Sequence, residues 1–229
     1  MNSIPASIKN YLSVGVIVVI SLLGLGGCSL STPTPPFQNT TPITIGASIS
    51  LSGVYSENGM ALQKGYQLWQ DAVNSRGGIL GRPIKFDFIS DDSTPAKVAA
   101  NYQRMITQNH DNLLVGPYST LLTLAAAPVA QQNKYAFIEG TGVAPAVFEP
   151  NYTNLFSVSL SATSYLKSFV YFILSIPRAQ RPKTIAFASS DDSFTESQIE
   201  EAQTLLKDSL CQVLRRPKTR RGEHGSEPA

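Results

Sequence analysis

Cysteine and histidine are scarce in this chain, and their scarcity narrows the possible functions. The sequence has two cysteines, Cys28 and Cys211, and two histidines, His110 and His224. None of the four is spaced from another as metal ligands usually are. The sequence also contains no GxSxG nucleophile elbow, no P-loop and no GxGxxG motif after its first predicted strand. We therefore predict no catalytic residues, no metal site and no cofactor.

Charge is also sparse, and its distribution argues against nucleic-acid binding. Charged residues make up 15% of the chain, and the formal net charge is +2. Five of the 18 basic residues lie in residues 211–229, together with two of the 16 acidic ones. Residues 1–210 are then slightly acidic. We expect no nucleic-acid partner, because a basic patch would have to be formed by the tail alone.

One apolar run stands out near the N-terminus. Lys9 precedes an uncharged stretch, residues 11–25, that ends in small residues and Cys28. This order is typical of a secretory signal, and the stretch is shorter than the roughly 20 residues of a spanning helix. Leu25-Gly26-Gly27-Cys28 resembles the lipobox of bacterial lipoproteins. The resemblance implies cleavage of residues 1–27 and a lipid anchor on Cys28, at the periplasmic or extracytoplasmic face of the cell envelope.

A linker is expected to follow the anchor. Residues 28–42 are rich in Ser, Thr and Pro, a composition that favours a semi-extended spacer over a folded core. Once Cys28 carries lipid, Cys211 has no partner within the chain, so no intramolecular disulfide is expected.

From Ile43 onward, apolar strands alternate with amphipathic helices. The predicted strands are Ile43–Ile49, Ile84–Ile89, Asn112–Val115, Tyr135–Ile138, Leu155–Val158 and Thr184–Ala188. The predicted helices are Asn58–Asn74, Thr94–Thr107, Ser119–Gln132, Ala162–Ser175 and Ser193–Lys207. Strands joined by single helices imply parallel βαβ units. The predicted fold class is α/β, with a doubly wound parallel sheet.

Three loops after predicted strands are candidates for a binding site. They are residues 50–59, 116–120 and 139–142, and all are rich in Gly, Ser or Thr. In an open parallel sheet, ligands bind beyond the carboxyl ends of the strands. Free N–H groups at helix N-termini there suit a carboxylate. The alternative is that these residues are only caps and turns.

Two acidic pairs and two aromatic residues have simpler interpretations. Asp91-Asp92 and Asp191-Asp192 each precede a predicted helix, which favours a capping role over a metal or acid–base site. Tyr66 and Trp69 recur at helical spacing and are expected to pack in the core.

The order of several motifs resembles a known family. The motifs are IGASISLSGVYSENG at 45–59, GYQLWQDAVNSRGGILGRPIKFDFISDDSTPAKV at 65–98, VGPYST at 115–120 and TLAAAPVAQQNKYAFI at 123–138. The stretch 43–210 looks like the start of the type I periplasmic solute-binding proteins that bind leucine, isoleucine, valine and related compounds. The resemblance implies a nearly complete first lobe at 43–160 and a partial second lobe at 161–210. It also implies binding of a small solute, such as an amino acid or amide-like compound, and handover to an ABC permease in the membrane.

The resemblance also assigns ligand-binding positions. The carboxylate of the solute would meet Ser119 and Thr120, and its carboxylate and ammonium would meet Thr141 and Gly140. The aromatic residue of the first loop would be Tyr55, or Tyr118 in its place, and that of the second lobe would be Phe194.

The chain departs from the family pattern after residue 210. Residues 211–229 show no apolar period and are basic, so we expect an unrelated, disordered tail where the family continues into a strand. This favours a truncated or frameshifted copy of a solute-binding lipoprotein. The alternative is a ligand-sensing receptor lobe that acts on a signalling partner, and an enzyme is not expected.

Overall fold

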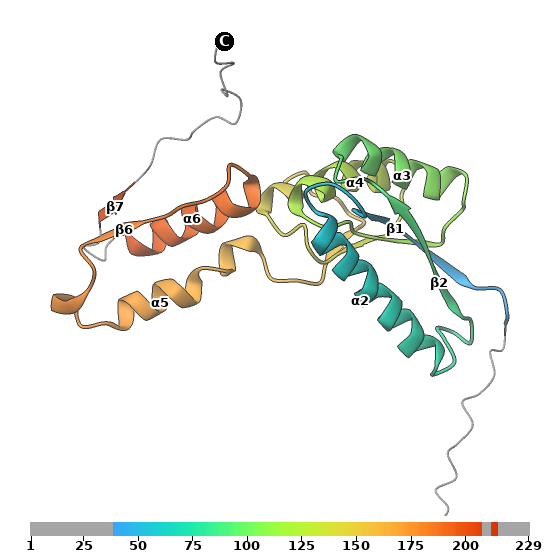
Figure 1. The fold of residues 1–229 in the computed structure, drawn as a ribbon, viewed down its shortest axis with the longest axis horizontal. Coiled ribbons are helices and arrows are strands. Elements are labelled where there is room, and N and C mark those ends of the chain that lie inside the picture. Colours follow the sequence, from blue (N-terminus) through green and yellow to red (C-terminus); the bar gives the residue numbers. More distant parts are fainter. Residues whose placement is uncertain (1–38, 208–211, 215–229) are drawn as a thin grey trace, which may run out of the picture. The chain divides into compact units, whose positions relative to one another are not determined.

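A five-stranded parallel sheet organises the first part of the chain (Figure 1). The computed structural model describes residues 39–207 and 212–214. The strands of this sheet are β1 (Ile43–Ile49), β2 (Ile84–Ser90), β3 (Leu113–Val115), β4 (Phe137–Glu139) and β5 (Leu155–Ser157), in the order β2-β1-β3-β4-β5. Every neighbouring pair in it is parallel. Successive strands are joined by α2 (Ser56–Asn74), α3 (Pro95–Thr107), α4 (Thr120–Gln132) and the 3₁₀ turn η1 (Pro145–Val147).

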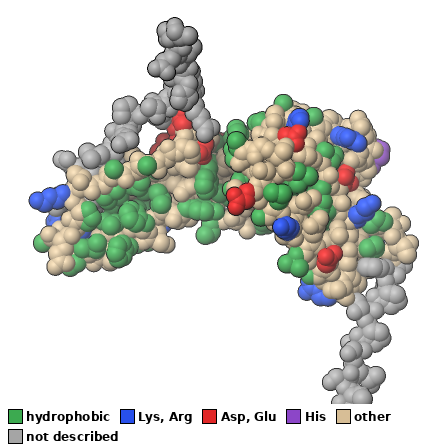
Figure 2. Space-filling view, in the orientation of Figure 1, with side chains coloured by type: hydrophobic (Ala, Val, Ile, Leu, Met, Phe, Trp, Pro, Cys, Tyr) green, Lys and Arg blue, Asp and Glu red, His purple; other side chains and the backbone are tan. Residues whose placement is uncertain are grey.

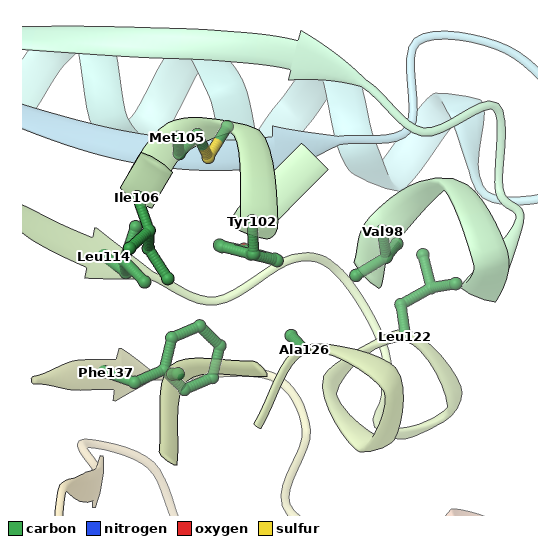
Figure 3. Close-up of a cluster of buried hydrophobic side chains, with 9 residues drawn as sticks. Val98, Tyr102, Met105, Ile106, Leu114, Leu122, Ala126 and Phe137 are labelled. Atoms are coloured by element: carbon green, nitrogen blue, oxygen red, sulfur yellow. The ribbon is translucent and has the colours of Figure 1, made fainter. Parts of the chain in front are cut away.

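Helices cover both faces of this sheet, which confirms the doubly wound α/β prediction. On one face, the odd-numbered residues of β1 and two residues of β2 form a buried cluster under α2: Ile43, Ile45, Ala47, Ile49, Ile84 and Phe86. On the other face, α3 and α4 enclose a second cluster around Tyr102, Met105 and Phe137 (Figure 3). Because side chains alternate along a strand, the apolar residues of β1 all lie on the face covered by α2, and β1 contributes no residue to the second cluster.

The strand order reverses beside β1. The chain passes from β1 to β2 on one side, and then returns to β3 on the other side of β1. Such a reversal makes the loops after β1 and β3 diverge at the carboxyl edge of the sheet, where ligands bind in folds of this kind.

A second, smaller unit follows β5. It contains η2 (Ala162–Ser164), α5 (Lys167–Ser175), η3 (Arg178–Gln180), β6 (Thr184–Ala186), α6 (Ser193–Leu206) and β7 (Gln212–Leu214). Strands β6 and β7 pair in parallel. The unit has a core of its own, made of Val170, Ile173, Ile185, Ala202 and Leu206.

Two expectations about this second unit are wrong. We expected no strand after residue 210, but β7 continues the βαβ pattern beside β6. We also expected one helix from Ala162 to Ser175, but the structure has a 3₁₀ turn at Ala162–Ser164 and an α-helix that begins at Lys167. Ser161 and Thr163 bond to each other through their hydroxyls at 3.0 Å, and such residues compete with the helical pattern.

Large apolar side chains are exposed on α5. Tyr171 is 57% exposed and Phe172 is 63% exposed. Figure 2 shows hydrophobic side chains gathered over the part of the surface that α5 forms.

The predicted leader, Cys28 and most of the predicted linker and tail lie outside the described residues. The last linker residues are attached to the turn before β2, because Arg82 donates to the carbonyls of Thr41 and Pro42 at 3.0 and 2.9 Å. Among the described helices, none is long and apolar enough to cross a membrane.

Candidate functional site

The loop after β1 is held by the loop after β2. Ser50 Oγ donates to the buried Asp91 at 2.6 Å, and Ser93 Oγ donates to the carbonyl of Ser52 at 2.8 Å. Ser93 Oγ also accepts from Tyr55 N at 3.0 Å. Asp91 also accepts from Ser93 N, whereas α3 begins after Thr94. The N-cap of α3 is Thr94, so the capping interpretation of Asp91-Asp92 is wrong. Both carboxylates anchor the first loop instead, since Asp92 accepts from Ser52 Oγ at 2.7 Å.

The second acidic pair behaves as predicted. Asp192 is the N-cap of α6 and accepts from Thr195 N at 2.9 Å. It satisfies one of the N–H groups that a helix start leaves unpaired.

Two tyrosines join the loops after β1 and β3. The rings of Tyr55 and Tyr118 meet edge to face, with centroids 5.6 Å apart. Both side chains are partly buried, so part of each ring remains available at the carboxyl edge of the sheet.

Two further tyrosines fix the end of β3. Tyr66 donates to the carbonyl of Gly116 at 3.0 Å, and Tyr102 donates to the carbonyl of Val115 at 2.6 Å. Tyr66 also stacks on Phe86, as its core spacing predicted. Trp69 meets Phe86 edge-on but is 42% exposed, so the prediction that it packs in the core is wrong.

Ser119 has a backbone conformation that is rare outside glycine. Its φ is 78° and its ψ is 153°, a region in which an L side chain is strained. Its hydroxyl caps α4 by accepting from Leu122 N at a long 3.4 Å. The first intrahelical hydrogen bond of α4 runs from Thr123 N to the carbonyl of Ser119. The N–H groups of Thr120 and Leu121 lie in the first turn, where a helix offers no acceptor for them.

The loops after β3 and β4 are bonded to each other. Thr141 Oγ1 donates to the carbonyl of Pro117 at 2.7 Å. Thr120 Oγ1 accepts from Ala144 N at 3.4 Å, and Thr120 is only 4% exposed. The hydroxyl of Thr120 therefore faces the loop after β4. The hydroxyl proton of Thr141 is used in its hydrogen bond to Pro117.

A buried carboxylate lies below the β4 loop, and it was missed from the sequence. Glu139 is fully buried at the end of β4. It accepts from Thr141 N at 3.0 Å and from Gly142 N, and Ser157 Oγ lies 3.5 Å from it. Burial raises the pKa of this carboxyl. The only signal in the sequence was an acidic residue at the end of an apolar strand.

The contacts above bring together most of the predicted site. Tyr55, Tyr118, Ser119, Thr120 and Thr141 belong to three loops linked by ring contacts and hydrogen bonds, and Gly140 lies between Glu139 and Thr141. Phe194 is not among these contacts. It lies in the first turn of α6, where its ring meets that of Tyr165 at 5.4 Å.

The sequence is similar to a known protein family and to a curated protein. Residues 42–226 match the model of a family described as "Periplasmic binding protein". BraC3, a Leu/Ile/Val-binding protein of Rhizobium johnstonii, is 26% identical over 113 residues, which are 49% of this chain and 30% of that protein.

Solved structures with a similar fold include two solute-binding proteins. The substrate-binding protein LivJ of Streptococcus pneumoniae, in complex with isoleucine, superposes with a TM-score of 0.60 at 22% identity, over 79% of this chain and 52% of that one. A solute-binding protein of Rhodopseudomonas palustris, in complex with 3,4-dihydroxybenzoic acid, gives a TM-score of 0.65 at 18% identity, over 76% and 46%. The chain therefore spans about half the length of these structures.

Proposed function

Because the chain belongs to the periplasmic binding protein family, we propose that it binds a small solute outside the cytoplasm for an ABC transporter. The solute would be an amino acid or an amide-like compound, and the membrane permease would be the partner. The proposal assigns a first lobe to residues 43–160 and part of a second lobe to the segment from residue 161 to the end of β7.

The conformation of Ser119 is the observation that carries this proposal. A serine in a region of φ and ψ that suits glycine costs about 1–3 kcal/mol, and such strain clusters at functional sites. The strained turn directs the chain from β3 into α4. The first N–H groups of α4 have no acceptor within the helix. The hydroxyl of Ser119 and these N–H groups together can donate to a carboxylate.

The surroundings of Ser119 also suit a ligand of this kind. The loops at 50–59, 116–120 and 139–142 contain no Lys or Arg, so neutral donors and the helix dipole would hold the carboxylate. The partly buried rings of Tyr55 and Tyr118 could cover an apolar side chain of the solute.

Nuclear magnetic resonance titration of the chain tests the proposal, since it detects binding even at millimolar affinity. L-leucine, L-isoleucine and L-valine are added separately to ¹⁵N-labelled protein. At least one of them is expected to shift the amide signals of residues 118–121. Ser119→Ala should weaken the effect, and Ser168→Ala, at an exposed serine of α5, should not. Absence of shifts at these amides with all three compounds would contradict the proposal.

We also propose that the protein is attached to the membrane through lipid on Cys28. The lipobox-like Leu25-Gly26-Gly27-Cys28 and the Ser, Thr and Pro that follow support this assignment. A lipid anchor would keep the binding unit close to the permease, and two or three acyl chains give stable attachment.

A further inference from the structure

Glu139 is a buried carboxylate with no cation bonded to it. In the part of the chain that the structure describes, the two recorded ion pairs are Asp92–Lys97 and Glu201–Lys167, and neither involves Glu139. Its hydrogen-bond partners are neutral N–H and O–H groups. A charge that is buried without an opposite charge has a strong influence on whatever binds nearby, because solvent screens it poorly.

The end of β4 offers acceptors and no donor side chain. Thr141 uses its hydroxyl proton on the carbonyl of Pro117, so only the lone pairs of Oγ1 remain for a ligand. The start of α4 is the opposite case, because the hydroxyl of Ser119 accepts from Leu122 N and keeps its proton for a ligand. The two loops therefore differ in what they offer a ligand. The start of α4 offers hydrogen-bond donors, whereas the loop after β4 offers acceptors next to the carboxylate of Glu139.

We propose that Glu139 determines the charge of the accepted ligand. It favours a carboxylate that also carries an ammonium group, placed over the β4 loop near Thr141, and it disfavours the same carboxylic acid without the amino group. The inference rests on the proposed function, since it concerns the same loops. Glu139 acts through space and through the loop that it holds, not by direct contact.

The groups around Glu139 stay neutral near pH 7, so a pH dependence of ligand binding there would report on the carboxyl of Glu139. The titratable neighbours are the phenols of Tyr66 on α2 and Tyr102 on α3, and α4 and β5 contribute the hydroxyls of Thr123 and Ser157. All four are neutral near pH 7. Burial raises the pKa of Glu139, and a second carboxylate nearby would raise it further. An acid without an amino group should therefore bind together with a proton.

The experiment compares L-leucine with 4-methylpentanoate, which is leucine without its amino group. Both are titrated by nuclear magnetic resonance into the full chain, into Glu139→Gln and into Glu149→Gln. Glu139→Gln is isosteric and keeps an oxygen to accept from Thr141 N and Gly142 N. Glu149 is exposed, so Glu149→Gln removes one charge as a matched control. Thermal unfolding of each variant verifies that it is folded.

In the wild type, leucine is expected to bind about tenfold more tightly than 4-methylpentanoate, a difference of about 1.4 kcal/mol. The affinity for 4-methylpentanoate should rise as the pH falls, while that for leucine stays constant. Glu139→Gln should reduce both the preference and the pH dependence, and Glu149→Gln should leave them unchanged. If Glu139→Gln keeps the full preference, or if the wild type shows none, the inference is overturned. If neither compound binds any of the proteins, the inference is overturned, and the proposed function fails as well only if the other compounds of its own test also give no shifts.

Discussion

Tyr66 and Tyr102 bond to consecutive carbonyls of the chain as it leaves β3, and they approach from opposite faces of the sheet. Tyr66, on α2, donates to Gly116, and Tyr102, on α3, donates to Val115. Tyr66 packs against the cluster under α2, whereas Tyr102 belongs to the cluster under α3 and α4. Both cores therefore fix the point at which the chain turns towards Ser119.

Removing one of these hydroxyls should loosen the turn. Tyr66→Phe leaves the Gly116 carbonyl without its tyrosine donor, and we expect a loss of about 1–3 kcal/mol in the free energy of unfolding. Hydrogen exchange should accelerate at residues 116–120. Chemical denaturation and exchange mass spectrometry measure the two effects. Tyr171→Phe, on the exposed side of α5, is the control and should change neither.

Ser119 should show a conflict between stability and binding. Ser119→Gly relieves backbone strain of about 1–3 kcal/mol and loses only a few tenths from the cap. We expect the variant to be more stable than the wild type in urea, yet to bind the solute less well. Ser119→Ala keeps the strain and loses the cap, so it should be less stable. Equal stability of the Gly and Ala variants would show that the turn is not strained.

Asp111 should make stability fall as the pH rises. It is 2% exposed, and its Oδ2 has no hydrogen-bond partner. Burial, and then the carboxylate of Asp87, raise the pKa of Asp111 to about 6, above the usual 3.8. The folded state then keeps a proton that the unfolded state releases, so stability decreases between about pH 4 and about pH 6.

Asp111→Asn should remove this dependence and be about 1–3 kcal/mol more stable than the wild type at pH 7. Urea unfolding across this pH range measures it. Asp71→Asn, at an exposed position of α2, provides the comparison and should leave the pH profile unchanged. A wild-type stability that stays flat over the same range would contradict the assignment to Asp111.

The proposed lipid anchor has a direct test in cells. Wild-type protein should fractionate with membranes and label with a palmitate analogue. Cys28→Ser should remain unprocessed or appear in the soluble fraction, because the modified thiol is absent. Cys211→Ser should behave like the wild type, since the lipobox-like segment ends at Cys28. A soluble, unlabelled wild type would contradict the proposal.

The sequence predicted the elements whose signals are local. Strand β1 has the predicted bounds, because its apolar residues alternate over seven positions. Pro95 begins α3, and Gly77 and Gly78 follow the end of α2. In each case the deciding residues lie within the element or next to it.

Features decided by distant residues were not predicted. The three residues of β7 have no apolar period, and they form a strand because β6 is beside them. Nothing in the sequence around Glu139 indicates that this carboxylate at the end of β4 is buried. The strain at Ser119 is also invisible in VGPYST, because it arises from the path of the chain between β3 and α4.

The chain has one tryptophan and nine tyrosines, and their placement separates two optical signals. Trp69 lies on α2 against Phe86, about 20 Å along the helix from Tyr55, at 1.5 Å for each residue. Its emission should follow the unfolding of the sheet and remain unchanged when a solute enters the loops. Tyr55 and Tyr118, whose rings touch at the site, should dominate any near-ultraviolet dichroism change on binding. Unfolding can therefore be followed by tryptophan fluorescence, and ligand binding by tyrosine circular dichroism, in the same sample.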